Sequence, residues 1–429
     1  MKKILQLKLK FFARMILKKY RPEIVAISGS IGKTSAKEAI YQVLSTKLSV
    51  RTSIKNYNNE IGLPLSVIGV ESPGSSLGGW FLVFWQAIKL CLFTDKDYPK
   101  FLILEMGIDR PGDMDYLTRL APPTIGVMTA VSYSHLEYFG SLQNIKKEKQ
   151  VLIERVNRKG LSVLNYDNEA ARSMAEVSPA RVLTYGFQPG ADLLAQDLNY
   201  HFQRGDYDFA GVNFKLSYEG SIVPVSLPHI LGEAGVYAAL AAAAVALHCG
   251  LNLMEIAESL RFLHLPAGRM QLLPGIKHSF LIDDSYNSSP EACLSALKVL
   301  GAIKADEGAS KYAALGEMLE IGSYSEEGHR LVGESVFAQG VDYLISVGER
   351  ARDIDRGAQA AGMSPDFIFH FDHSEEAGRF IQERLRAGDI LLVKGSQGAR
   401  MERVVKELMA EPDRAAELLV RQGSAWIKD

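Results

Sequence analysis

The stretch EIVAISGSIGKTSAKEAIYQVLS, residues 23–45, decides the fold of the first part of the chain. A short apolar, β-branched run leads into a turn with two glycines, and apolar residues at helical spacing follow, which predicts a strand, a loop and a helix. In the loop GSIGKTS, residues 29–35, glycines let backbone N–H groups approach phosphate oxygens, while a lysine and a hydroxyl can serve the terminal phosphates and Mg²⁺. We therefore predict a binding site for ATP or GTP.

The candidate phosphate-binding residues of this loop are Gly29, Ser30, Gly32, Lys33, Thr34 and Ser35. The loop departs from the general pattern, because Ile27 stands five residues before Gly32, where a glycine is usual. A chance match to so short a pattern is the alternative interpretation. The position between a predicted strand and a predicted helix favours the phosphate site, and it leaves the reaction open.

The rest of the first half of the chain continues the same alternation of strands and helices. Apolar strands in residues 101–107 and 124–131 are separated by polar helical stretches, which is typical of a parallel sheet with helices on both faces. Residues 196–228 alternate apolar and polar side chains and predict a β-meander. The alanine-rich residues 233–250 predict a buried helix closed by Gly250.

A second series of strands and helices begins after LPAGRMQ, residues 265–271. Its five short strands are expected in residues 279–286, 311–318, 341–348, 366–371 and 389–395. We therefore predict the α/β fold class, with a leader helix over residues 1–22, a phosphate-loop ATPase domain with a mostly parallel sheet over 23–265, and a Rossmann-like domain over 266–429.

The composition excludes several classes of protein. The chain has 429 residues, of which 47% are apolar and 23% are charged, as in globular proteins. Lys plus Arg number 48 and Asp plus Glu number 50, so the net charge of −2 offers no field for nucleic acid. Three scattered cysteines, Cys91, Cys249 and Cys293, fit a reducing compartment. We predict a monomeric cytoplasmic protein without a nucleic-acid partner.

Two segments depart from this average surface. Residues 1–22 carry eight Lys and Arg side chains and no acidic one, which predicts a basic amphipathic helix; no small-residue cleavage site follows it. Residues 77–93, LGGWFLVFWQAIKLCLF, hold Lys89 as the only charge and are shorter than the roughly 20 residues of a membrane span. Packing on the core and contact with the inner face of the membrane are equally good interpretations of residues 77–93.

The shortened loop GSIGKTS resembles that of the Mur ligase family, ATP-dependent enzymes that extend the peptide of the bacterial cell-wall precursor. Further motifs resemble the family in its own order along residues 23–410: NYNNEIGLPL (56–65), LEMG (104–107), SHLEYFGS (134–141), KKEKQVL (146–152), PAGRM (266–270), DDSYNSSP (283–290), LGEMLEIGSYSEEGH (315–329) and VKGSQGARME (393–402). The segments NNEIG, DDSYN, LGEMLEIG and VKGS resemble most the branch that adds D-alanyl-D-alanine.

The resemblance implies ATP and two Mg²⁺ ions, held by Thr34, Glu105, His135 and a carbamylated Lys149. Glu105 ends an apolar strand, where ligand sites of open sheets lie, although a buried structural glutamate would look the same. His135 alone fits a satisfied histidine equally well. On composition Lys149 belongs to a solvated helix face, and Lys147 is its nearest competitor; the spacing within the family's motif favours Lys149.

Five residues of the second half gain roles from the resemblance. Arg269 follows a Pro-Ala-Gly hinge and could reach phosphates with its planar fork, or be an ordinary surface arginine. The resemblance assigns Asp284 to the ribose and Asn287 to the adenine, where turn capping is the alternative. Lys394 and Ser396, again at a strand end, would face the amino substrate or the phosphates.

In the first half, Asn58, Asn59 and Glu60 lie on a loop that borders the substrate in the family. The resemblance also implies an N-terminal domain that grips uridine diphosphate, yet only residues 1–22 precede the first predicted strand. We therefore expect an acceptor that lacks a nucleotide handle, that is held by the other two domains or a partner, or that is presented at a membrane contacted by residues 1–22 and 77–93. The expected reaction is amide formation through an acyl phosphate, with peptide or other small-molecule substrates. A ligase for another carboxylate and amine and a non-catalytic nucleotide-binding scaffold are the alternatives.

Overall fold

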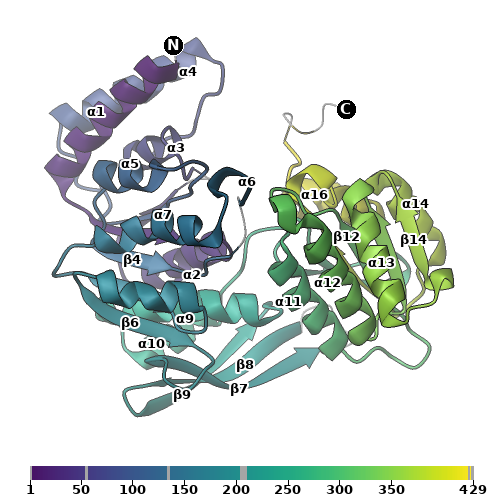
Figure 1. Cartoon of the computed structure of the whole chain (residues 1–429). Helices are drawn as coiled ribbons and strands as arrows, with labels where there is room; N and C mark the ends of the chain where they lie inside the picture. The colour runs from purple at the N-terminus through teal and green to yellow at the C-terminus, as the bar shows by residue number, and fades with distance from the viewer. Residues whose placement is uncertain (1, 54–56, 133–135, 203–209, 424–425, 427–429) are drawn as a thin grey trace.

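A computed structural model gives the structure of the protein and describes residues 2–53, 57–132, 136–202, 210–423 and 426. The first half forms a nine-stranded sheet in the order β2-β3-β1-β4-β5-β6-β7-β8-β9 (Figure 1). Its strands are β1 (Glu23–Ser28), β2 (Val50–Thr52), β3 (Phe101–Glu105), β4 (Ile125–Met128), β5 (Leu161–Asn165), β6 (Arg181–Gly186), β7 (Leu193–Phe202), β8 (Ala210–Tyr218) and β9 (Ser221–Pro228). Strands β1 to β6 pair in parallel and β7 to β9 are antiparallel, as the sequence predicted.

Helices cover both faces of this sheet because its strands are apolar on both sides. On β1, Val25 and Ile27 pack on one face, and Ile24 and Ala26 pack on the other. The helices of the first half are α1 (Lys2–Tyr20), α2 (Lys33–Ser45), α3 (Gly62–Ile68), α4 (Leu77–Leu92), α5 (Asp113–Leu120), α6 (Leu136–Phe139), α7 (Leu142–Glu154), α8 (Glu169–Arg172), α9 (Glu233–His248) and α10 (Leu253–Leu260).

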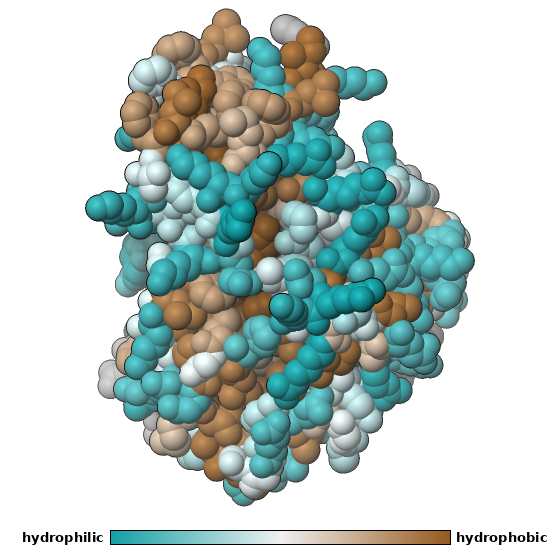
Figure 2. All heavy atoms as spheres, turned by 90° about the vertical axis from the view of Figure 1, so that its left-hand side faces the viewer, coloured by the Kyte–Doolittle hydropathy of each residue, from teal (hydrophilic) through white to brown (hydrophobic). Residues whose placement is uncertain are grey.

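The two segments with unusual composition, residues 1–22 and 77–93, form the helices α1 and α4, which lie side by side at one end of the first domain (Figure 1). Each buries one stripe against the domain, including Leu9, Ala13 and Ile16 of α1 and Val83 of α4. Each also leaves large apolar side chains exposed, and Figure 2 shows apolar residues gathered at this end of the molecule. Neither interpretation of residues 77–93 is therefore sufficient alone.

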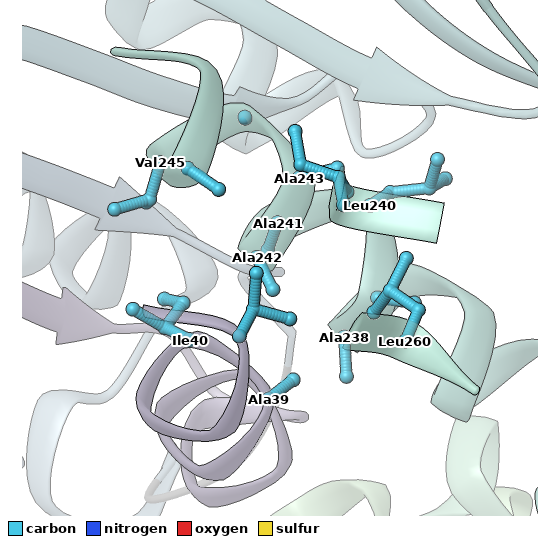
Figure 3. Packing of buried hydrophobic residues seen from close by; sticks show 14 of the residues in the cluster. Ala39, Ile40, Ala238, Leu240, Ala241, Ala242, Ala243, Val245 and Leu260 are labelled. Atoms are coloured by element: carbon cyan, nitrogen blue, oxygen red, sulfur yellow. The ribbon is translucent and has the colours of Figure 1, made fainter. Parts of the chain in front are cut away.

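On the opposite face of the sheet, α9 is the predicted alanine-rich helix, and Ala239 through Ala246 are all at most 1% exposed. Small side chains let a helix approach its neighbour closely. Figure 3 shows Ala238 and Ala242 close to Ala39 and Ile40 of α2. This packing fixes α2 and, with it, the loop that precedes it.

The second half forms a separate six-stranded sheet in the order β10-β11-β15-β12-β13-β14. Its strands are β10 (Gln271–Pro274), β11 (Phe280–Asp284), β12 (Lys311–Gly316), β13 (Tyr343–Val347), β14 (Ile368–Phe371) and β15 (Ile390–Lys394). Its α-helices are α11 (Pro290–Ala302), α12 (Ser325–Ala338), α13 (Arg352–Ala361), α14 (Ser374–Arg384), α15 (Glu402–Leu408) and α16 (Ala415–Leu418). All five predicted strands form and pair in parallel, whereas the antiparallel edge strand β10 was not predicted.

Candidate functional site

The loop between β1 and α2 is built by the local sequence. Gly29 has φ 149°, and a Cβ placed there would stand 2.0 Å from Thr129 Oγ1, so only glycine fits. Gly32 has φ 83° and is the N-cap residue that precedes α2. From β1 the chain passes through α2 to β2 and then to β3 on one side of β1, and it continues to β4 on the other side, so this loop stands at the point where the strand order reverses. Ligands of open α/β sheets bind at this position.

Two lysines, the half-buried Lys33 and the buried Lys149, converge beneath the loop. Lys33 Nζ donates to the carbonyl oxygens of Gly29 and Ser30 at 2.9 and 3.2 Å. Lys149 Nζ, from α7, donates to the same Gly29 oxygen at 2.8 Å. Among the residues that the structure describes, neither ammonium is bonded to a carboxylate. Buried cations need a counter-charge, so this pair fits an anionic ligand such as a triphosphate.

The surroundings of both lysines shift their pKa in the same direction. Burial lowers the pKa of Lys33, which Glu105 and Asp109 oppose. Burial also lowers the pKa of Lys149 well below its usual value, and the neighbouring Lys33 ammonium lowers it further. Lys149 is 1% exposed, whereas its competitor Lys147 lies on the exposed face of the same helix. Burial, which the sequence could not decide, thus distinguishes Lys149 from Lys147.

Oxygen ligands lie next to the lysines. The register that pairs Ile27 with Glu105 brings the end of β3 beside the phosphate loop. Thr34 Oγ1 donates to Glu105 Oε2 at 2.8 Å, and Asn58 Nδ2 donates to Glu105 Oε1 at 3.3 Å. A hydroxyl and a carboxylate are the donors that Mg²⁺ prefers, so Thr34 and Glu105 fit that ion. The predicted third ligand, His135, lies outside the described residues.

The second domain faces these groups with an ion pair at the ends of two neighbouring strands. Asp284 of β11 is in register with Lys394 of β15, and Lys394 Nζ donates to Asp284 Oδ2 at 2.6 Å and to the Asn287 carbonyl at 3.0 Å. The Arg269 guanidinium lies 3.9 Å from the ring centroid of Tyr286, which holds it at the same edge of the sheet. These residues therefore form the second wall of the site.

The two walls enclose one cavity of about 610 Å³, a size that suits a nucleotide or a small-molecule substrate. The predicted site residues that line it come from both halves of the chain: Ser30, Gly32, Lys33, Thr34, Ser35, Asn58, Glu105, Lys149, Arg269, Asp284, Asn287 and Lys394. The cavity thus brings together residues that lie hundreds of positions apart in the sequence.

Four predicted residues lie beside the cavity rather than in its wall. Gly29 lies underneath and offers its carbonyl to both lysines. Asn59 caps the turn before α3 by accepting from the N–H groups of Ile61 and Gly62. Glu60 accepts from Gln6 of α1 at 2.8 Å. Ser396, the fourth, is 2% exposed and accepts from the Leu319 N–H at 2.8 Å, so it positions the loop that carries Leu319 into the cavity.

Several lining residues were not predicted. Asp167 follows β5 and accepts from the Tyr237 hydroxyl at 2.8 Å and from the Phe187 N–H at 2.6 Å. Asn168 holds the Val131 N–H at 3.1 Å. The polar run NYDN directly after an apolar strand was a signal for both, since carboxyl ends of parallel strands meet at one edge. Tyr286 carried no such signal.

Asp283, the neighbour of Asp284, gives the second domain a stability that depends on pH. It is fully buried, and burial raises its pKa to about 6. The pKa of an aspartate in the unfolded state is lower, at about 3.9. Between these two pKa values the folded state holds a proton that the unfolded state has lost, so the free energy of unfolding falls as pH rises through this window. Above pH 6, ionisation of Asp283 should lower the free energy of unfolding of the natural protein by a value on the order of 3 kcal/mol. Asp283→Asn cannot ionise, so we expect it to be more stable than the natural protein above pH 6.

Urea unfolding of both proteins across this pH range measures the difference. Asp413→Asn, a change at an exposed aspartate of the same domain, is the matched control and should leave the pH dependence unchanged. A stability difference between Asp283→Asn and the natural protein that stays constant with pH would contradict the raised pKa.

The fold and the cavity define a class of protein: an α/β enzyme with a nucleotide site on one domain and a second, Rossmann-like domain closing over it. Comparison with known proteins narrows this class. Residues 86–246 match the Mur ligase middle domain, and residues 268–397 match the Mur ligase glutamate ligase domain. The chain belongs to the Mur ligase family, which confirms the predicted family and the predicted fold class.

Among its curated relatives are enzymes named UDP-N-acetylmuramoyl-tripeptide–D-alanyl-D-alanine ligase. That of Mycobacterium bovis is 30% identical over 405 residues, which cover 90% of this chain and 73% of the relative. That of Bacillus subtilis is 26% identical over 93% of this chain and 79% of its own length. A solved structure of the MurF ligase from Thermotoga maritima in complex with ADP is 25% identical, covers 95% of this chain and 84% of its own, and has a TM-score of 0.75.

Proposed function

We propose that the protein is an ATP-dependent, ADP-forming ligase that adds D-alanyl-D-alanine to the peptide of a cell-wall precursor. The observation that carries the proposal is one shared cavity in which Lys33 and Lys149 of the first domain face Arg269 and the Lys394–Asp284 pair of the second. The proposed substrates are those stated in the names of the relatives, which are UDP-N-acetylmuramoyl-tripeptide–D-alanyl-D-alanine ligases. The ADP complex of the Thermotoga maritima relative supports ATP as the energy source.

The reaction follows from the chemistry of amide formation. A carboxylate is a poor electrophile, and ATP activates it: the carboxylate oxygen attacks the γ-phosphorus, the bond between that phosphorus and the β,γ-bridging oxygen breaks, and ADP leaves. The amine then attacks the acyl phosphate, and inorganic phosphate leaves with the bonding pair while the amine loses a proton. No nucleophilic side chain is needed, because positioning and charge stabilisation carry the catalysis.

The lining residues divide this work. Lys33 offsets the charge of the phosphates, and Arg269 approaches from the second domain. Asp284 and Asn287 are assigned to the ribose and the adenine. Residues near the acceptor and the amine would be Asn58, Asn59, Glu60, Lys394 and Ser396. A cavity between two domains also limits the access of water to the acyl phosphate.

Mg²⁺ belongs to this proposal, and it would supply charge neutralisation at the transferring phosphoryl group. Thr34 and Glu105 would hold one ion, and His135 with a carbamylated Lys149 would hold a second. The lowered pKa of Lys149 supports the carbamate, because a neutral amine is the form that adds to CO₂. The three cysteines, none of which forms a disulfide, fit the proposed location in the cytoplasm, where we propose a monomer.

The test is a coupled measurement of phosphate release and product mass. With ATP, the tripeptide precursor and D-alanyl-D-alanine, we expect one phosphate per amide and a product whose mass is the sum of both substrates less one water. Omitting the amine is the control. Turnover with another carboxylate and amine but not with this pair would support a different Mur-type ligase, and nucleotide binding without any amide product would support a scaffold.

A further inference from the structure

Helix α1 carries two apolar stripes, and the domain covers only one of them. Leu9, Ala13 and Ile16 are 0% exposed and pack on the core. The second stripe recurs every three or four residues, so it lies on one face of the helix, and it is exposed: Ile4, Leu7, Phe11 and Met15 are between 42% and 66% exposed. The core therefore covers one apolar stripe of this helix and leaves the other exposed.

Helix α4 repeats the arrangement. Val83, Ala87 and Leu90 are buried at 3% exposure or less. Another set of large apolar side chains on α4 and the residue after it is open to solvent, with exposures from 37% to 87%: Leu77, Phe81, Leu82, Trp85, Ile88, Leu92 and Phe93. We call these residues, together with the exposed stripe of α1, the α1–α4 surface; Figure 2 shows apolar residues gathered over this region. Monomeric proteins rarely expose so many large apolar side chains together without a partner.

The two helices form one unit. Lys19 Nζ, near the end of α1, donates to the carbonyl oxygens of Leu90 and Phe93 at 2.9 and 2.6 Å, where α4 ends. A cation at this end of a helix also interacts favourably with the helix dipole. The rings of Phe12 and Phe84 lie 5.9 Å apart between the helices. The two helices that carry the exposed apolar side chains are thus fixed to each other by hydrogen bonds and ring contacts.

The charges of the unit are of one sign. Helix α1 has seven Lys and Arg side chains and no acidic one, and Lys89 is the only charge on α4. Lys3, Lys18 and Lys89 are exposed. The acidic side chains near α4 lie in the segments that flank it, at Glu71, Asp95 and Asp97. A two-fold contact between copies would bring the same basic helix against itself, which like charges oppose. An anionic partner with an apolar interior suits both properties of the surface.

We infer that the α1–α4 surface binds the surface of an anionic bilayer, with both helices lying in the interface plane. Basic side chains meet anionic headgroups, and the Trp and Phe side chains enter the boundary with the acyl chains. In the described part of the chain no helix is long and apolar enough to cross a membrane. Gln6 of α1 donates to Glu60, which lies on the loop that carries Asn58 into the cavity. If the proposed function holds, ligase chemistry therefore takes place beside the bilayer.

Vesicle sedimentation tests the inference without reference to catalysis. We expect the protein to sediment with vesicles of phosphatidylcholine and phosphatidylglycerol, and more weakly with phosphatidylcholine alone. The triple variant Phe11→Ser, Phe81→Ser, Trp85→Ser should lose at least about tenfold in affinity. Phe262→Ser is the matched control, since this side chain is 72% exposed on another part of the domain, and it should bind as the natural protein does. All four sites are exposed, so thermal unfolding should confirm that each variant folds.

The charge contribution is tested separately. The variant Lys3→Gln, Lys18→Gln, Lys89→Gln should lose about fivefold in affinity per lysine for the anionic vesicles, and added salt should weaken binding by the natural protein. Lys406→Gln, at an exposed lysine of the second domain, is the control. The inference is overturned by absent binding to anionic vesicles, by equal binding of the triple apolar variant, or by a dimer in analytical ultracentrifugation that this variant dissociates and that binds no lipid.

Discussion

Replacing Lys33 with methionine is expected to lower the rate of ADP formation by at least about a thousandfold, because the variant keeps the shape of the side chain and loses its charge at the transferring phosphoryl group. Lys33 is positioned for this role by its bonds to the Gly29 and Ser30 carbonyls, and it is part of the cavity wall. A steady-state assay that couples ADP release to a spectroscopic signal measures the effect.

The same substitution should leave the fold intact. Lys33 is half-buried, and its ammonium lowers the pKa of the buried Lys149, so removing the Lys33 charge relieves a repulsion between two cations. Urea unfolding should therefore show no loss of stability. Lys47→Met, at a lysine that is 56% exposed and paired with Glu255 on the surface of the same domain, is the matched control and should keep full activity. A Lys33→Met protein that turns over at the natural rate would remove the proposed phosphate site.

The parts of the site that the sequence predicted share one property: they depend on local order. Gly29 and Gly32 must adopt positive φ between a strand and a helix, and a few consecutive residues of the sequence are enough to predict this. Glu105, Asp284 and Lys394 end apolar strands, so the parallel sheets alone bring them to the ligand-binding edge. The resemblance to a family then assigned roles to them.

The parts that the sequence could not predict depend on contacts between distant segments. Asn59 belongs to a loop that enters the cavity, yet its side chain caps the turn before α3, because the turn at Ile61 and Gly62 offers two N–H donors nearby. Strand β10 is four residues long and gains its place only by pairing with β11. The composition of α4 was compatible with a core helix and with a membrane-surface helix, and the structure buries one stripe of it in the core and leaves another exposed.

Lys149 illustrates how the structure resolves what composition left open. Lys146, Lys147 and Lys149 share one polar helical segment, and the period of α7 decides which of them turns inward. Ile145, Lys149 and Leu152 fall on the buried face, so the ammonium of Lys149 reaches the Gly29 carbonyl at 2.8 Å while Lys147 stays in solvent. Burial lowers the pKa of Lys149, so this side chain loses its charge more readily than its exposed neighbours. Lys149 is therefore the residue on which a carbamate would depend.

We accordingly expect Lys149→Ala to lower turnover by at least about a hundredfold, and Lys147→Ala to leave it unchanged. A lost carbamate can be replaced by a small carboxylate in the space that the shortened side chain leaves, so formate or acetate should restore part of the activity of Lys149→Ala. Neither acid should affect the natural protein or Lys33→Met, since the charge missing in that variant is positive. The carbamate itself should appear as a ¹³C resonance in the natural protein supplied with ¹³C-bicarbonate. Persistence of that resonance in Lys149→Ala would place the carbamate on another lysine, and full activity of Lys149→Ala would remove the residue from catalysis, because the buried amine would then serve only to hold the Gly29 carbonyl.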